Sequence, residues 1–168
     1  MNTEIVNRPV HVGGVDIEPQ PNYPFDFIQA DALAFLRGIS YENGGGFKAI
    51  HASPPCQAFT SARVIHGREH PDLLTPTRVL LEQTAIPWVI ENVPGAPMKA
   101  HLTLCGSMFD LHTVNGALRR HRLFEFSSLV ALPPQPSCEH DPFMPTISVF
   151  GHGGHVYPGV EDWKRVMQ

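Results

Sequence analysis

The most informative stretch of this chain is Ile50-His51-Ala52-Ser53-Pro54-Pro55-Cys56-Gln57-Ala58-Phe59-Thr60. A strand is predicted over residues 47–52, and it should stop at the two prolines because proline cannot extend a β-ladder. Cys56 then lies on a rigid loop beyond the carboxyl end of that strand, where ligands and reacting groups gather in open α/β sheets. A thiol held there is suited to nucleophilic attack if nearby groups stabilise its thiolate.

Strand-like and helix-like segments alternate on both sides of this loop. The predicted strands cover residues 10–17, 25–29, 47–52 and 87–91. The predicted helices cover residues 32–38, with Asp31 as N-cap, and 75–84, with Pro76 in the first turn, where proline is tolerated. Such alternation predicts an α/β fold with a mostly parallel sheet and crossover helices. After residue 129 the sequence is rich in proline, with a further short strand expected at 147–150 and a helix beginning at 162.

Composition narrows the class of protein. A chain of 168 residues with 42% hydrophobic content can bury one core of its own. No apolar run approaches the roughly 20 residues that span a bilayer, and the first residues do not resemble a signal peptide. Three cysteines without paired spacing indicate reduced thiols. We therefore expect a cytoplasmic protein without membrane association.

The charge distribution argues weakly against DNA binding overall and in favour of it locally. The net charge is −4, although contacts to phosphates require Lys and Arg. Two basic stretches are nevertheless candidates for a DNA-facing surface, namely Arg119, Arg120, His121 and Arg122, and more loosely Arg63, His66, Arg68 and His70. Solvated surface charge is the alternative for both stretches.

Three motifs resemble those of DNA cytosine-5 methyltransferases. The Pro-Pro-Cys-Gln of residues 54–57, followed by Phe59 and Thr60, is similar to the catalytic loop of that family. Glu91-Asn92-Val93 resembles the family's Glu-Asn-Val strand end, and Arg120-His121-Arg122 resembles its Arg-x-Arg element. The motifs occur in the family's order within residues 10–125. A buried, inert cysteine is the alternative for the first motif taken alone.

The resemblance implies a fold and a division of the chain. The fold would be a Rossmann-like methyltransferase fold, with a mostly parallel sheet that is incomplete at both ends. Residues 1–128 would form the catalytic core, and residues 129–168 a loop-rich remnant of the target-recognition and C-terminal region. Small methyltransferase-like chains of this kind suggest a phage or prophage origin, a role in DNA methylation or restriction-modification, and the cytoplasm of a bacterial or phage-infected host cell.

The resemblance also implies a reaction. Cys56 would attack C6 of cytosine, so that C5 can accept a methyl group from S-adenosylmethionine. Glu91 would donate a hydrogen bond or proton to N3, Arg122 would contact O2, Arg120 would stabilise the site, and Asn92 would orient the loop. The partner would be double-stranded DNA, and the target base would have to be flipped out of the helix.

The cofactor residues are carried over in the same way. Asp16 would bind the ribose hydroxyls, Ile17 would pack on the adenine, Asp31 would lie near the adenine amino group, and Pro54 would also contact the cofactor. Both acids have ordinary alternatives as helix caps or turn residues.

The chain departs from the family pattern in three places. No Phe-x-Gly-x-Gly turn precedes the strand expected at residue 10, and Gly13-Gly14 is not a substitute. No closing strand follows Trp163, and Leu118 replaces the glutamine that usually precedes Arg-x-Arg. Binding of S-adenosylmethionine is therefore expected to be weak or absent unless a partner chain supplies the missing strands.

Three other interpretations remain open. The chain could be an inactive methyltransferase remnant that binds DNA or a partner chain. It could also be a pyrimidine-modifying enzyme that uses another C5 electrophile. Zinc binding by Cys138, His140, His152 and His155 is a weaker alternative, because Cys-x-His is not a usual zinc knuckle and both halves lie on irregular segments. We therefore predict no metal site.

Overall fold

The computed structural model describes residues 11–39, 46–60, 70–99, 101–131, 134 and 137–147. Several expectations lie outside these residues, including most of the looser basic stretch, residues 148–150 of the C-terminal strand, the loop 151–155 with its two histidines, and the helix at 162–168. None of the helices in the described part of the chain is both long and apolar enough to cross a bilayer.

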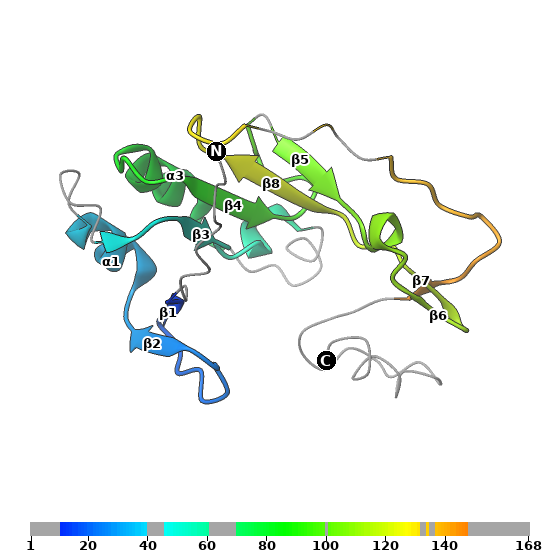
Figure 1. The fold of residues 1–168 in the computed structure, drawn as a ribbon, viewed down its shortest axis with the longest axis horizontal. Coiled ribbons are helices and arrows are strands. Elements are labelled where there is room, and N and C mark those ends of the chain that lie inside the picture. The colour runs from blue at the N-terminus through cyan, green and yellow to red at the C-terminus, as the bar shows by residue number, and fades with distance from the viewer. Residues whose placement is uncertain are drawn as a thin grey trace, which may run out of the picture.

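The central element of the fold is a four-stranded sheet with the strand order β3-β4-β8-β5. Its strands are β3 (Ile50–Ala52), β4 (Trp88–Asn92), β8 (Arg122–Phe126) and β5 (His101–Leu104). β3 and β4 are parallel, whereas β8 runs antiparallel to both β4 and β5. Figure 1 shows these strands side by side, with the helices α1 and α3 near the β3–β4 half.

The structure has mixed α/β content, and the expectation of a mostly parallel sheet is wrong. Parallel pairing holds between β3 and β4, which are joined through a helix as parallel strands require. After β4 the chain reaches β5, and β8 then returns between β4 and β5 in the opposite direction. Both pairings of β8 are antiparallel, so the four-stranded sheet as a whole is mixed.

A separate parallel pair lies before the central sheet. β1 (Gly13–Asp16) and β2 (Asp26–Gln29) pair in a register that places Asp16 opposite Gln29. Packing explains why residue 14 is a glycine, because a Cβ there would lie 2.6 Å from Cζ of Tyr23. The two glycines of β1 are therefore part of a strand, as the sequence indicated.

A third small sheet was not foreseen in full. β6 (His112–Thr113) and β7 (Gly116–Leu118) form an antiparallel hairpin, and β9 (Thr146–Ile147) adds to β7 in parallel. A 3-10 helix, η3 (Gly106–Phe109), precedes the hairpin. The described part of the C-terminal segment is thereby attached to the body of the protein.

The core lies where α1 (Ala32–Gly38) and α3 (Leu74–Glu82) pack near β4. Its fully buried members include Leu74, Leu81 and Ile90. α1 begins and ends where the sequence predicted, and Asp31 caps it by accepting a 2.7 Å hydrogen bond from the amide of Ala34. The helix at α3 is also confirmed, with ends that differ by one or two residues from the prediction.

A buried ion pair connects α3 to β8. Nε of Arg78 lies 2.7 Å from Oε1 of Glu125, and Nη2 lies 2.8 Å from Oε2. Arg78 also donates to the carbonyl of Pro97, and the amide of Lys99 donates to Glu125. The hydrogen bond to Glu125 is the main reason that the pKa of Arg78 is raised. These contacts fix β8, whose first residue is Arg122, relative to the helix that packs on β4.

Candidate active site

Cys56 lies just beyond the carboxyl end of β3, as expected. β3 stops at Ala52, and residues 53–55 carry the chain to Cys56, which precedes the 3-10 helix η2 (Gln57–Phe59). The carbonyl of Cys56 accepts a 2.9 Å hydrogen bond from the amide of Phe59. The thiol is free and partly exposed, so a reactant can reach it.

Asn92 holds this loop in place. It ends β4 and is 1% exposed. Its Nδ2 donates a 3.1 Å hydrogen bond to the carbonyl of Pro54, and its Oδ1 accepts a 2.9 Å bond from the amide of Val93. The orienting function predicted for Asn92 therefore has a direct structural basis, because one side chain joins the ends of β3 and β4.

Glu91 and the Arg-x-Arg element meet at the same end of the sheet. Because β8 is antiparallel to β4, with Asn92 opposite Leu123, the start of β8 lies beside the end of β4. Nε of Arg122 pairs with Oε1 of Glu91 at 2.7 Å, with about a quarter of each side chain exposed. The guanidinium of Arg122 also donates to the carbonyl of His121. An ion pair between Glu91 and Arg122 was not part of the sequence prediction.

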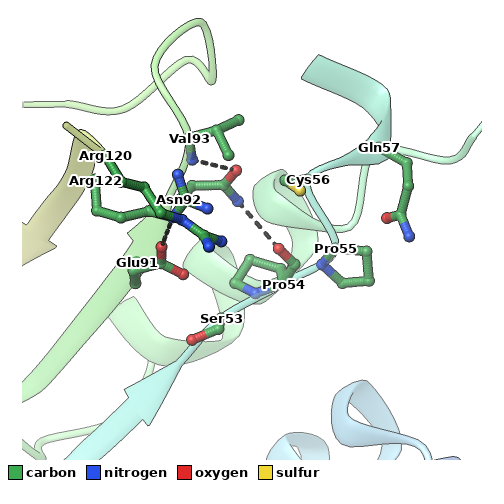
Figure 2. A pocket seen from close by; sticks show the side chains of 10 residues that line it. All are labelled: Ser53, Pro54, Pro55, Cys56, Gln57, Glu91, Asn92, Val93, Arg120 and Arg122. Carbon is green, nitrogen blue, oxygen red and sulfur yellow. Dashed lines mark hydrogen bonds and ion pairs between the residues drawn. The ribbon is translucent and has the colours of Figure 1, made fainter. Parts of the chain in front are cut away.

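These side chains line one cavity of about 300 Å³. Its lining includes all four residues predicted to be catalytic, namely Cys56, Glu91, Arg120 and Arg122, together with Pro54 and Asn92. Figure 2 shows Cys56 on one side of this cavity and Glu91 with the two arginines on the opposite side. The structure therefore brings together residues that are separated by as many as 66 positions in the sequence.

The electrostatics of the cavity favour negative charge. Two arginines and one glutamate line it. Burial of its guanidinium is the largest cause that lowers the pKa of Arg120, and the nearby charge of Arg122 acts in the same direction. Glu91 and Cys56 act in the opposite direction.

The predicted cofactor residues are only partly assembled. Asp16 is the last residue of β1, Asp31 lies two residues beyond the end of β2, and Ile17 is 62% exposed. The carboxylate of Asp16 accepts hydrogen bonds from the amide of Glu18 and the side chain of Gln20, and Asp31 caps α1. Of the four residues, only Pro54 lines the cavity that contains Cys56.

The basic stretch at residues 119–122 divides between two roles. Arg119 does not line the cavity that contains Cys56, and its Nη2 donates to the carbonyls of Asp141 and Met144. It therefore ties the C-terminal segment to the end of β7. Arg120 and Arg122 line the cavity, whereas His121 lies near the thiol of Cys138.

A second group of reactive side chains was missed by the sequence interpretation. Cys105, His121, Cys138 and His140 bring their possible ligand atoms within 4.8 Å of one another. Cys138 and His140 belong to the weaker zinc alternative in the sequence, whose other two residues, His152 and His155, lie outside the described residues. No local pattern could have identified Cys105 and His121, because both are distant in the sequence.

Comparisons with protein-family models, curated proteins and solved structures give no match for this chain. The chemistry of the cavity therefore has to be judged from its own residues.

Proposed function

We propose that this chain carries the base-binding and nucleophilic half of a DNA cytosine-5 methyltransferase. The observation that supports this most strongly is the single cavity shared by Cys56, Glu91, Arg120 and Arg122. A volume of about 300 Å³ is at the small end of ligand pockets, which suits one planar base. A Rossmann-like arrangement is part of the same proposal, supported by the parallel β3–β4 pair with the cavity at its carboxyl ends.

In the proposed reaction the thiolate of Cys56 adds to C6 of a flipped cytosine and forms a carbon–sulfur bond. Electron density then shifts to C5, which becomes nucleophilic. S-adenosylmethionine would supply the electrophilic methyl group by cleavage of its sulfur–methyl bond and leave as the neutral thioether S-adenosylhomocysteine. Loss of the C5 proton to a base and departure of the Cys56 thiolate restore the ring, so the thiol is regenerated.

The Glu91–Arg122 ion pair indicates how the cavity would receive the base. Arg122 would turn part of its guanidinium toward O2 of cytosine, while Glu91 faces N3. Protonation at N3 withdraws electrons from the ring and makes C6 easier to attack. A base that expels water and competes for Arg122 would weaken the existing ion pair, and Glu91 would then take up a proton from solvent and donate it in a hydrogen bond to N3.

The cofactor is proposed to bind this 168-residue chain weakly. Asp16, Ile17 and Asp31 are available only for the adenosine end, and Asp16 already accepts two hydrogen bonds. Contacts to the charged methionine end have no glycine-rich turn in the sequence. A loss of about 4 kcal/mol weakens binding roughly 1,000-fold, so calorimetry on this chain should give a dissociation constant nearer millimolar than micromolar.

Covalent trapping tests the proposal. DNA duplexes with 5-fluorocytosine at many sequence contexts would be incubated with the chain and saturating S-adenosylmethionine. The fluorine cannot leave as a proton does, so the adduct at Cys56 should persist through denaturing electrophoresis. Peptide mapping should locate the modified base on Cys56.

Two variants complete the experiment. Cys56→Ser should give no adduct, because a hydroxyl is a far weaker nucleophile near neutral pH. Val114→Ser is the control, because Val114 is 96% exposed and lies outside the cavity, and it should still give an adduct. Absence of any adduct on the folded parent chain at saturating cofactor would refute the proposed function, as would an adduct that maps outside Cys56.

A further inference from the structure

A second site is formed by four side chains from three separate segments. Cys105 follows β5, His121 precedes β8, and Cys138 and His140 come from the irregular stretch 137–145. The Sγ atom of Cys138 lies 3.0 Å from Nε2 of His140 and 3.3 Å from Nε2 of His121. The Sγ atom of Cys105 lies 3.4 Å from Nε2 of His140.

These separations match the dimensions of a tetrahedral zinc site. Zinc binds thiolate sulfur at about 2.3 Å and imidazole nitrogen at about 2.0–2.1 Å, so neighbouring ligand atoms lie about 3.3–3.8 Å apart. All four ligand atoms here lie within 4.8 Å of one another. Two sulfurs and two nitrogens suit zinc and exclude calcium and magnesium, which require oxygen ligands.

The surroundings favour a metal over a simple hydrogen-bonded cluster. The rings of His121 and His140 are tilted by 55° with centroids 5.2 Å apart, so they converge on the sulfurs without stacking. The hydroxyl of Ser107 donates to Sγ of Cys105 at 3.3 Å and lies 3.5 Å from Sγ of Cys138. A hydroxyl in this position supports thiolate ligands from outside the first shell of contacts.

The segment 137–145, which carries two of the ligands, has few other contacts that could hold it in place. Between β8 and β9 the described residues form only turns and irregular structure, and β9 itself contains only two residues. Such a stretch buries little apolar surface, and Phe143 within it is 92% exposed. A closed structural metal site would hold it against the end of β5 and the start of β8.

We propose that Cys105, His121, Cys138 and His140 bind one structural Zn²⁺ ion. His121 stands between Arg120 and Arg122, which line the catalytic cavity from the same strand start. The metal would therefore fix the backbone that carries both arginines, in addition to anchoring residues 137–147. The site does not depend on the proposed methyltransferase reaction.

Metal analysis of the purified chain is the first test. Protein that is refolded with zinc and then freed of excess metal should contain one zinc ion per chain, as measured by elemental mass spectrometry. Cobalt substitution should give the intense visible bands of a tetrahedral site and the near-ultraviolet band of thiolate–cobalt charge transfer. Loss of a ligand should weaken zinc binding by more than the roughly 10- to 100-fold that follows loss of an outer-shell contact.

Matched variants make the assignment specific. Cys138→Ser and His121→Asn should lose stoichiometric zinc, whereas Cys56→Ser and the double change of His152 and His155 to Asn should keep it. If the ligand variants do not fold, alkylation of the parent chain decides instead. Zinc should then protect Cys105 and Cys138 but not Cys56, and a chelator should remove the protection.

Three results would overturn the zinc site. They are a folded parent chain without stoichiometric zinc, a cobalt spectrum without thiolate charge transfer, and a Cys105–Cys138 disulfide in the native protein. Loss of zinc from the double histidine variant alone would also reject this ligand set in favour of the one suggested by sequence spacing.

Discussion

Replacement of Asn92 by alanine tests whether this one side chain positions the loop that carries Cys56. Asn92 is 1% exposed and makes two hydrogen bonds, to the carbonyl of Pro54 and from the amide of Val93. An alanine would leave both backbone groups without these partners and a small void at the end of β4. Complete burial of two unsatisfied groups costs about 2–6 kcal/mol.

The structure places the expected cost near the lower end of that range. Pro54 and Val93 are only partly buried, so water can replace some of the lost hydrogen bonding. We therefore expect Asn92→Ala to lower the free energy of unfolding by about 2 kcal/mol, which is roughly a 30-fold change in the unfolding equilibrium. The released loop should also change the rate at which iodoacetamide alkylates Cys56.

Urea denaturation, followed by tryptophan fluorescence, measures the first effect, and peptide mapping of alkylated protein measures the second. Gln57→Ala is the matched control, because Gln57 is an exposed amide on the same loop, and it should change stability by less than about 0.5 kcal/mol. The reasoning would be refuted if Asn92→Ala unfolded at the parent's urea midpoint and kept the parent's Cys56 alkylation rate.

Two further predictions concern the elements that carry the site. Glu125→Gln should lower the free energy of unfolding by about 3–5 kcal/mol, because it leaves buried Arg78 without its charge partner. The double change Arg78→Met with Glu125→Leu should cost less than the sum of the two single changes. A double change that costs as much as this sum in urea denaturation would contradict the reasoning. Asp72 accepts hydrogen bonds from the hydroxyl of Thr75 and from the amides of Leu74 and Thr75 at the start of α3, and the Thr75 hydroxyl is the main reason that its pKa is lowered from 3.8. Because the pKa of Asp72 is lower in the folded state than in the unfolded state, its contribution to stability is present above pH 3.8 and is lost as the pH falls through the folded pKa. Asp72→Ala should therefore lower the free energy of unfolding by about 1 kcal/mol at pH 7 and by almost nothing at acid pH. Thermal melts over a series of pH values measure the difference.

Local signals in the sequence predicted the elements that depend on local chemistry. Asp31 followed by an apolar periodic run gave α1 with the ends that the structure has. The Pro54-Pro55 pair ended β3, and the apolar run before Glu91 gave β4, although β3 is shorter than predicted. The convergence of Cys56 and Glu91 follows from the parallel direction of these two strands, which a helical connection requires.

Strand order and direction after β4 could not be obtained in this way. Whether β8 lies between β4 and β5 depends on which apolar faces meet in three dimensions, and no residue near Arg122 encodes that choice. The β6–β7 hairpin was also missed, and its two-residue loop is Val114-Asn115, between the paired residues Thr113 and Gly116. The Glu91–Arg122 ion pair follows from the antiparallel register of β4 and β8, so it could not be predicted from the sequence without that register.

The reversed direction of β8 links the two sites of this molecule. Had β8 run parallel to β4, Arg122 would lie at the opposite edge of the sheet from Cys56 and Glu91. Because it runs antiparallel, its first residues lie beside the ends of β3 and β4, with Arg120 and Arg122 in the cavity. His121 lies among Cys105, Cys138 and His140, and the Arg78–Glu125 pair holds the other end of the same strand. One strand, held by polar contacts near both ends, therefore determines where the two cationic groups stand relative to the thiol.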